Sequence, residues 1–539
     1  MWSGNDTGVS GMKKEQFKRQ ANFVKDKGQN ALIKLIFSRV MLTAVLMIVQ
    51  IVFWVWIFGK MGAYSKWVLY SFNILAAVLV IIIINSDENP AFKMTWMLPL
   101  CLVPFFGAML YLFIQVNPAR IGMKRGLHKR IEETKPYLEP NEEVIQRMWE
   151  EKAPITDISY YIQYLNGLPT YDKTAVTYFS DGEQKFLDMI PELKKAEKFI
   201  FLEYFIINPG RVWDEVLEVL EEKAAEGVEV RVLYDGFNSI LKLPNKYPEI
   251  LKKKGIKAKE FAPVMPFLSS HQNYRDHRKI LVIDGKVAYN GGINLADEYM
   301  NYIERFGYWK DTAVKLKGDA VKSFTAMFLQ MWNMMEQGEE DYKKYLCVDC
   351  EPVVSGNLGY VIPYNDDPCN GEDIAESVYL DILNKAQNYV YIMTPYLIPE
   401  NEIITALRFA AQRGVDVRII MPHIPDKKTA FDIAHTYYLQ LLDAGVKIYE
   451  FTPGFVHAKM FISDDDRAVV GTINLDFRSL YEHYECATFI YGNPVIREIK
   501  ADFMKTFDRC ERFKEEDYKK LPLFNRIRGK VGRLFAPLM

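Results

Sequence analysis

Cysteine is scarce and scattered in this sequence of 539 residues. Its six cysteines stand at positions 101, 347, 350, 369, 486 and 510, and this spacing excludes a small disulfide-rich secreted protein. Cys347 and Cys350 form a CxxC, but a zinc site needs two further ligands and Cys369 alone does not supply them. We therefore predict no metal site and no cofactor, and we interpret the thiols as incidental.

A strong charge of either sign is also lacking. The formal net charge is −2, so the overall charge does not indicate a nucleic acid as partner. The length exceeds that of one compact domain and suits two or three.

Charged residues are absent from three long apolar stretches near the N-terminus, residues 40–59, 67–85 and 94–118. A helix needs about twenty apolar residues to cross a bilayer core of roughly 30 Å, and Trp54, Trp56 and Trp67 fall near the ends of these runs, where indoles favour the interface. We predict a transmembrane region at 40–118 that follows a basic N-terminal tail at 1–39. A re-entrant pairing of the first two stretches is the alternative. The first run starts late, is long and lacks a small-residue cleavage site, so a cleaved signal peptide is not predicted.

Basic residues flank this region on both sides. Lys25, Lys27, Lys34 and Arg39 precede it, and a denser cluster follows it, made of Arg120, Lys124, Arg125, Lys129, Arg130 and Lys135. With three spans the flanks lie on opposite sides, so the positive-inside rule acts in both directions. The denser cluster favours a multi-pass protein of the cell membrane whose C-terminal part is cytoplasmic.

The rest of the chain repeats itself. Strand-like and helix-like runs alternate at 198–206, 213–227 and 228–235, and the same order returns at 389–397, 400–414 and 415–422. Self-similarity of this kind indicates an α/β fold made of two duplicated units, which we expect to pack about a pseudo-twofold axis. We predict a linker at 119–165, a first domain at 166–345, a second at 346–515, and a basic amphipathic tail at 516–539.

Each copy carries the same short motif. HRKILVID occupies residues 277–284 and HAKMFISD occupies 457–464. If both are strands, His277 and Lys279 share one face, as do His457 and Lys459, because alternate side chains of a strand point the same way. Asp284 lies off that face in a DG turn, which favours a structural role. At equal spacing after Asp284 and Asp464 come GGIN and GTIN, which end in Asn294 and Asn474.

This set of residues suits phosphoryl chemistry. Two lysines and two asparagines can surround an anion with several oxygens, such as a phosphate. Two imidazoles can divide the labour, since one can attack phosphorus while the other protonates the leaving alkoxide.

The motif HxKxxxxD followed by GxxN, present twice, resembles the phospholipase D superfamily over residues 166–515. The N-terminal apolar region together with NGLPTY, SDGEQKF and LEYFI is similar to the bacterial cardiolipin synthase group. The resemblance implies that both HxKxxxxD sets are catalytic, that is His277, Lys279, Asp284, His457, Lys459 and Asp464. It implies His277 as the nucleophile and His457 as the acid and then the base. Asp311, in GYWKD, and Glu485, in HYECA, match the acids that orient the histidine of the other copy.

The implied reaction transfers a phosphatidyl group from one phosphatidylglycerol to another through a phosphohistidine, giving cardiolipin and glycerol. A hydrolytic phospholipase D, another phosphatidyltransferase of the same superfamily, and a non-catalytic membrane lipid-binding protein are the alternatives. Whether phosphatidylethanolamine can be the donor stays open. Expected partners are phosphatidylglycerol, anionic membrane lipids and the membrane, with no nucleic acid, and a homo-oligomer stays open. Arg526, Arg528, Lys530 and Arg533 alternate with apolar residues in the tail, which indicates an interfacial helix or a disordered basic end.

Overall fold

The structure is a computed structural model that describes residue 52 and residues 62–115, 118–237, 242–263, 274–348, 358–369 and 371–538. The chain forms two compact units. The first comprises Met1–Val116 with Val264–Ser270, and the second comprises Asn117–Pro263 with His271–Met539.

The described part of the first unit is helical. It contains α3 (Gly62–Ile84), α4 (Pro90–Leu102) and α5 (Pro104–Gln115). Asn89 caps α4 by accepting a hydrogen bond of 2.8 Å from the backbone N–H of Ala91. Val103, which precedes a proline, leaves the helical region with φ −141° and ψ 73°, so α4 ends there and α5 begins at Pro104.

The prediction of three membrane spans is not confirmed. The first stretch, 40–59, lies outside the described residues apart from Val52, and the second lies in α3 except for Asn85, which follows the helix. The third, 94–118, is divided at Pro104 into parts of two helices of 13 and 12 residues. Among the described residues, no helix has both the length and the apolar character of a membrane span.

The second unit begins with helices where we predicted a linker. They are α6 (Pro118–Thr134), α7 (Glu142–Glu150) and α8 (Thr156–Asn166). Arg130 of α6 is almost completely buried, and its guanidinium donates hydrogen bonds to the carbonyls of Asn333 and Glu336, the first of them at 3.0 Å. These bonds fasten α6 to the end of α13 (Val321–Asn333).

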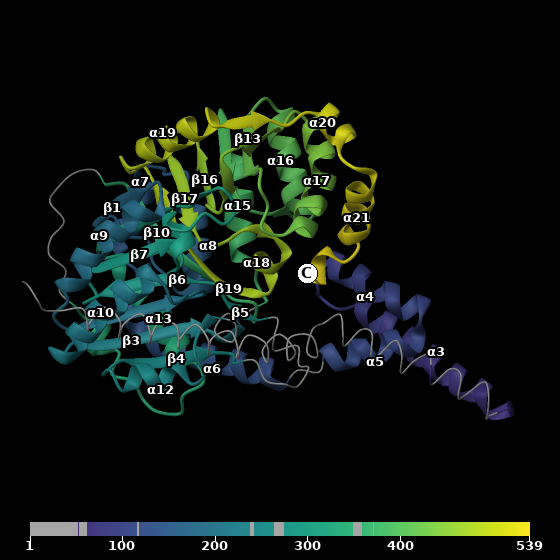
Figure 1. The fold of residues 1–539 in the computed structure, drawn as a ribbon, viewed down its shortest axis with the longest axis horizontal. Helices are drawn as coiled ribbons and strands as arrows, with labels where there is room; N and C mark the ends of the chain where they lie inside the picture. Colours follow the sequence, from purple (N-terminus) through teal and green to yellow (C-terminus); the bar gives the residue numbers. More distant parts are fainter. Residues whose placement is uncertain are drawn as a thin grey trace, which may run out of the picture. The chain divides into compact units, whose positions relative to one another are not determined.

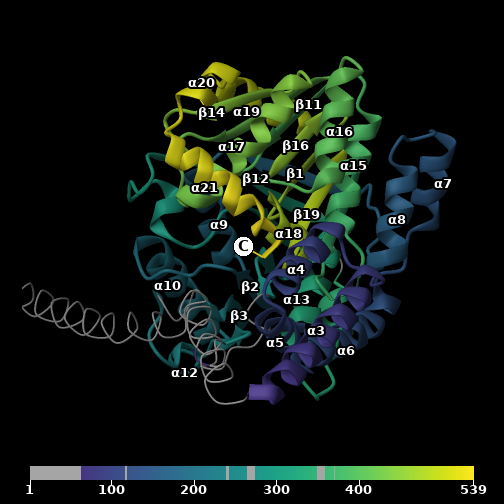
Figure 2. The ribbon, with the colours of Figure 1, turned by 90° about the vertical axis from the view of Figure 1, so that its right-hand side faces the viewer.

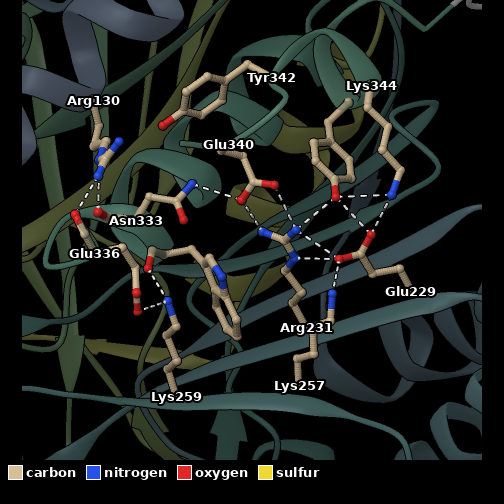
Figure 3. A network of polar contacts seen from close by, with 12 residues as sticks. Arg130, Glu229, Arg231, Lys257, Lys259, Asn333, Glu336, Glu340, Tyr342 and Lys344 are labelled. Carbon is tan, nitrogen blue, oxygen red and sulfur yellow. Dashed lines mark hydrogen bonds and ion pairs between the residues drawn. The ribbon is translucent and has the colours of Figure 1, made fainter. Parts of the chain in front are cut away.

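A polar network covers the same edge of the unit (Figure 3). Arg231 contacts both carboxylate oxygens of Glu340, at 2.7 and 3.0 Å, and Glu229 at 2.8 Å. The carboxylate of Glu229 also accepts hydrogen bonds from the ammonium groups of Lys257 and Lys344. The segment after α13 is thereby held against β3 (Glu229–Asp235), because a planar guanidinium binds carboxylates with fixed geometry.

Two mixed sheets follow, and the strand order of the first corresponds strand by strand to that of the second, which β20 extends at one end. The first sheet has the order β1-β9-β7-β6-β2-β3-β4 and the second has β10-β19-β17-β16-β11-β13-β14-β20. In the first, β2, β3 and β4 are parallel and the remaining pairs are antiparallel, and in the second β11, β13 and β14 repeat that arrangement. The bounds in the first sheet are β1 (Thr174–Phe179), β2 (Phe199–Tyr204), β4 (Lys257–Phe261), β6 (Lys279–Ile283), β7 (Val287–Gly291) and β9 (Ala313–Gly318).

The bounds in the second sheet are β10 (Tyr360–Asp366), β11 (Tyr389–Met393), β13 (Asp416–Pro422), β14 (Lys447–Phe451), β16 (Met460–Ser463), β17 (Arg467–Gly471), β19 (His483–Tyr491) and β20 (Cys510–Arg512). Helices accompany each sheet: α9 (Gly182–Lys194), α10 (Arg211–Ala225), α12 (Tyr247–Lys252) and α13 in the first repeat; α15 (Ile374–Lys385), α16 (Asn401–Gln412), α17 (Lys428–Asp443), α18 (Phe477–Tyr481) and α19 (Ile496–Phe507) in the second. We call β1 to α13 the first repeat and β10 to β20 the second repeat. The predicted duplicated α/β fold is confirmed.

The two repeats share a hydrophobic core. One cluster joins Ile280 and Val314 of the first sheet to Met460 and Ile490 of the second. Helix α13 is buried along its whole length and contacts β2 and β6 as well as β10. In Figure 1 the first repeat, in teal, and the second, in green to yellow, accordingly lie side by side.

Short strands cross between the repeats just before each motif histidine. In the first repeat, β5 (Arg275–Asp276) pairs in parallel with the start of β19, so that Arg275 is opposite His483. In the second, β15 (Gly454–Val456) pairs in parallel with β8 (Tyr308–Lys310) of the first. The histidine of each repeat therefore lies beside a strand of the other repeat.

The chain ends in α20 (Glu515–Lys520), α21 (Leu523–Arg533) and η4 (Ala536–Leu538). Figure 2 shows α21, in yellow, along α17. A side chain at Gly529 would overlap the backbone carbonyl of Asp432, so glycine permits this close approach. The carboxylate of Asp432 also binds Arg528, and the predicted amphipathic tail is thus a docked helix in the structure.

Candidate active site

The motif histidines stand just before strands rather than within them. Strand β6 begins at Lys279 and β16 begins at Met460, so the prediction that each motif is one continuous strand is wrong at its first residues. The reason lies in the backbone, because the N–H of His277 bonds the carbonyl of Tyr484 at 3.0 Å and that of His457 bonds Lys310 at 2.6 Å. Both bonds join one repeat to the other.

Each imidazole meets a carboxylate of the opposite repeat. Nδ1 of His277 lies 2.7 Å from Oε1 of Glu485, and Nδ1 of His457 lies 2.6 Å from Oδ2 of Asp311. The two acids are fully buried and both histidines are more than nine-tenths buried. A carboxylate in this position fixes the ring orientation and stabilises an imidazolium.

The two motif lysines are buried beside the histidines. The ammonium groups of Lys279 and Lys459 each donate to the backbone carbonyl of the histidine two residues earlier. Burial lowers the pKa of Lys279 to about 8 and that of Lys459 to about 7, and each lysine feels the charge of Asp311 and Glu485. Because each lysine interacts with an acid from both repeats, the two motif sets belong to one site.

The site disfavours positive charge on its imidazoles. Burial lowers the pKa of His277 well below its usual value, with Lys279 adding to the effect. Burial and Lys459 lower the pKa of His457 to about 4, although Asp311 opposes them. Burial raises the pKa of Glu485. An anion entering between the lysines would favour protonation of the imidazoles, because an opposite charge nearby stabilises the charged form.

The two motif asparagines are buried near the histidines and make internal hydrogen bonds. Asn294 accepts from the N–H of Ile206 at 2.9 Å and donates to the hydroxyl of Tyr299 at 2.8 Å. Asn474 donates to Ser479 at 2.9 Å, while no partner for its Oδ1 is found among the described residues. Each amide keeps one further N–H hydrogen for a ligand.

The motif aspartates hold the backbone. Asp284 accepts from the N–H groups of Glu197, Lys198 and Phe199 at 2.7–2.8 Å, which fixes the entry into β2. Asp464 binds the corresponding N–H groups of residues 387–389, before and at the start of β11, at 2.7–3.0 Å. Both aspartates adopt positive φ in their turns.

The GxxN turns differ between the repeats in a way that matches their acids. Thr472 of GTIN donates its hydroxyl to Oε2 of Glu485. In GGIN, a side chain on Gly292 would overlap Oδ1 of Asp311, and that oxygen instead accepts from the N–H of Thr312 at 2.8 Å. The first repeat therefore packs the shorter Asp311 against a glycine, whereas the second repeat supports the longer Glu485 with the hydroxyl of Thr472.

Two groups of side chains in the described residues could supply ligands to a metal. His277, His483 and Glu485 bring ligand atoms within 4.8 Å of one another, as do Glu376, Glu400 and Glu402. Two imidazoles and a carboxylate suit zinc, but His277 and Glu485 are already engaged with each other. The residue types alone therefore do not assign a metal here.

Comparison with known proteins identifies the family. The family described as "Cardiolipin synthase, PLD-like domain" matches residues 189–332 and 379–507, and "Phospholipase_D-nuclease N-terminal" matches 73–115. A cardiolipin synthase of Halalkalibacterium halodurans is 33% identical over 488 residues, which cover 88% of this chain and 95% of that protein. The chain belongs to the phospholipase D-like cardiolipin synthase family.

Further relatives agree with this assignment. A cardiolipin synthase of Geobacillus thermodenitrificans is 34% identical, covering 87% of this chain and 94% of that protein. An uncharacterized protein of Streptococcus mutans is 51% identical, covering 85% of this chain and 99% of that one. The crystal structure of phosphatidylserine synthase from Haemophilus influenzae shares the fold, with a TM-score of 0.53 at 15% identity, over 71% of this chain and 98% of that chain.

Sequence reasoning missed two further residues that lie beside the motif side chains. His483 is buried with its ring 5.4 Å from that of His277. Lys185 is buried with its ammonium 3.1 Å from the hydroxyl of Tyr204, and burial lowers its pKa to about 7. Lys185 belongs to SDGEQKF and His483 stands two residues before Glu485, so proximity to the motifs was the available signal.

Proposed function

We propose that this chain is a cardiolipin synthase that transfers the phosphatidyl group of one phosphatidylglycerol to the glycerol hydroxyl of a second, releasing glycerol. The crossed pairs His277–Glu485 and His457–Asp311 carry this proposal, because they supply two oriented imidazoles to one site. The cardiolipin synthases named above are similar over nearly their whole length.

In the first half of the reaction, Nε2 of His277 attacks phosphorus. Its Nδ1 faces Glu485, which favours the tautomer with a lone pair on Nε2 and stabilises the cation that forms. His457 protonates the departing glycerol oxygen as the P–O bond breaks. The products are a phosphohistidine at position 277 and free glycerol.

In the second half the roles of His457 reverse. Its neutral imidazole takes the proton from the hydroxyl of the second phosphatidylglycerol while that oxygen attacks phosphorus. The P–N bond to His277 breaks and cardiolipin leaves. Burial lowers the pKa of His457, which favours the neutral form that this step requires.

The charge on the phosphate is met by Lys279 and Lys459, aided by the amides of Asn294 and Asn474. Both ammonium groups are almost completely buried, so their attraction to an anion is little screened by solvent. We assign Asp284 and Asp464, which the family motif includes, to holding the backbone under the site.

We also propose the domain division at 166–345 and 346–515. The strands from β1 to β9 lie within the first range, and those from β10 to β20 lie within the second. The helices α6 and α7 then precede the first domain, and α8 ends at its first residue.

The exposed face of α21 supports a further proposal, namely that the enzyme contacts an anionic lipid surface there. Large apolar side chains on this helix and just after it are between 45% and 68% exposed: Leu523, Phe524, Ile527, Val531, Leu534 and Phe535. Their spacing by about four residues sets them along the helix, with basic residues between them. In surface-dilution kinetics, Ile527→Glu should raise the apparent KM for phosphatidylglycerol in mixed micelles more than Ile527→Ala does.

Mass spectrometry of the products from defined lipids tests the main proposal. The full chain given only phosphatidylglycerol should form cardiolipin and glycerol in equal amounts, and His277→Ala should form neither. Phosphatidic acid as sole product would indicate a hydrolytic phospholipase D. Full turnover by His277→Ala would point to catalysis elsewhere, whereas no turnover and tight lipid binding by the unmodified chain would fit a lipid-binding protein.

A further inference from the structure

Two N–H-bearing rings flank the proposed phosphate site at equivalent positions of the two repeats. His483 stands two residues before Glu485, and Trp309 stands two residues before Asp311. The ring of His483 is 5.4 Å from that of His277, and the indole of Trp309 is 5.3 Å from the ring of His457. Each ring therefore lies against the histidine that its neighbouring acid orients.

Both rings are buried without satisfying their polar atoms. His483 is 7% exposed and Trp309 is 6% exposed. Within the part of the chain that the structure describes, the two ring nitrogens of His483 have no hydrogen-bond partner. The same holds for the Nε1–H of Trp309. A nearby approach, Nδ1 of His483 to Oε1 of Glu485, measures 3.8 Å, which is too long for a hydrogen bond.

A buried donor without a hydrogen-bond partner destabilises a fold. Two of them at matching positions beside the same centre indicate that a ligand satisfies them, because buried polar groups in proteins normally have partners. The rest of the surroundings are well packed. Trp309 contacts Tyr299 and Phe455, while Phe205 lies 4.8 Å from His277 and 6.4 Å from His483.

The charges around His483 indicate which ligand this is. Burial lowers its pKa well below the usual value, and the cations of Arg478, Lys279, Lys427 and Arg275 act in the same direction. The ring is therefore neutral and carries one N–H donor amid positive charge. The Nε1–H of Trp309 can only donate. Oxygens of an anion complement both groups.

We propose that His483 and Trp309 donate hydrogen bonds to phosphate oxygens of the bound lipid, one from each side of the site. The inference rests on the proposed function for the identity of the lipid. Free phosphate offers the same oxyanion to these two donors and can therefore serve as a probe. The two rings bind and position the phosphorus centre without exchanging protons with it. They thus complement the two lysines, which supply charge but little direction.

Thermal unfolding of the full chain with and without inorganic phosphate tests the first part. In His483→Phe a ring of similar shape replaces the unsatisfied imidazole, so the melting temperature without phosphate should rise, while the affinity for phosphate falls about tenfold, which corresponds to about 1.4 kcal/mol. Trp309→Phe removes its indole N–H and should weaken phosphate binding similarly. His483→Asn keeps an N–H donor and should lose less affinity than His483→Phe.

His435→Phe is the matched control. His435 is also a buried histidine, but it lies in α17 with Nε2 3.2 Å from Glu450, so its loss should leave phosphate affinity unchanged. A fall in melting temperature for His483→Phe with unchanged phosphate affinity would show a packing role and overturn the proposal.

The lipid provides the second arm. The KM for phosphatidylglycerol should rise in His483→Phe and Trp309→Phe along with the weakened phosphate binding. A raised KM with unaltered phosphate affinity would place the contact elsewhere on the lipid and contradict the inference. A wild-type chain that binds phosphate through these rings yet forms no cardiolipin would refute the proposed function and leave the inference standing.

Discussion

Nδ1 of His277 lies 2.7 Å from Oε1 of Glu485, although the two residues are 208 positions apart and belong to different repeats. The reciprocal pair, His457 with Asp311, spans 146 positions. Backbone pairing between the repeats creates both contacts. It places β5, just before His277, beside β19, which contains Glu485, and it places β15, just before His457, beside β8, which ends just before Asp311.

The crossed pairing predicts which variants share a phenotype. Glu485→Gln should impair formation of the phosphohistidine as His277 variants do, and we expect a fall of about 10²–10⁴ in its rate. Asp311→Asn should instead impair the steps that need His457. Rapid-quench trapping of the phosphorylated chain, with a donor that has a good leaving group, separates the two effects. If Asp311→Asn slowed the trapping as strongly as Glu485→Gln, the assignment of His277 as nucleophile would be wrong.

The glycine-backed acid predicts an asymmetric response to serine. Gly292→Ser should displace Asp311 and lower kcat about a hundredfold or more, because His457 then lacks its oriented partner. Thr472→Ser keeps the hydroxyl that binds Glu485 and should stay close to wild-type activity. Steady-state rates of cardiolipin formation measure both, and equal losses in the two variants would contradict this reading of the turns.

The buried charges predict a pH dependence. Burial lowers the pKa of Lys459 to about 7 and that of Lys279 to about 8, so the cations that hold the phosphate are present below these values and are lost above them. We expect kcat/KM to fall as pH rises through 7 and 8. On the acid side His277 takes up a proton only well below pH 6.5. The fraction of His457 that is protonated declines above its pKa of about 4, so kcat/KM already falls with rising pH below 7 and falls more steeply through 7 and 8.

The comparison with arginine checks the alkaline limb. Lys459→Arg keeps its charge, so the residual activity of that variant should fall at a higher pH than that of the wild type. A profile that is flat from pH 5 to 9 would exclude the titration of these groups as its cause.

The network around Arg231 predicts a large effect on stability far from the site. Arg231→Met leaves Glu340 and Glu229 without their buried cation and should lower the free energy of unfolding by about 3–5 kcal/mol. Lys257→Ala removes a cation that is 62% exposed and should lower it by about 1 kcal/mol or less. Denaturant titration of the full chain measures both, and similar values for the two variants would mean that burial contributes little here.

The internal repeat of the sequence made the architecture predictable. Matching runs of alternating strands and helices predicted two equivalent sheets, and the twofold HxKxxxxD and GxxN motifs predicted a shared site. The acids at 311 and 485 came from the family resemblance. In each case the signal was local, because a strand or a motif occupies only a few consecutive residues.

What the sequence did not reveal depends on contacts between distant residues. The short strands β5 and β15 pair with the other repeat through backbone groups, which leave no side-chain pattern. His483 lies in the site because β19 carries it beside His277, and its position two residues before Glu485 did not by itself distinguish it from an ordinary buried histidine. The division of residues 94–118 at Pro104 was visible in principle, but uninterrupted apolar composition outweighed the prolines at positions 99 and 104.

The exchange of β5 and β15 between the repeats has a consequence for how such a chain can be divided or can have arisen. A half-molecule would possess an imidazole without its carboxylate and a carboxylate without its imidazole, so only two associated halves could turn over substrate. Fusion into one polypeptide removes the need for the halves to be identical. The glutamate held by a threonine on one side and the aspartate packed on a glycine on the other are the divergence that such freedom permits.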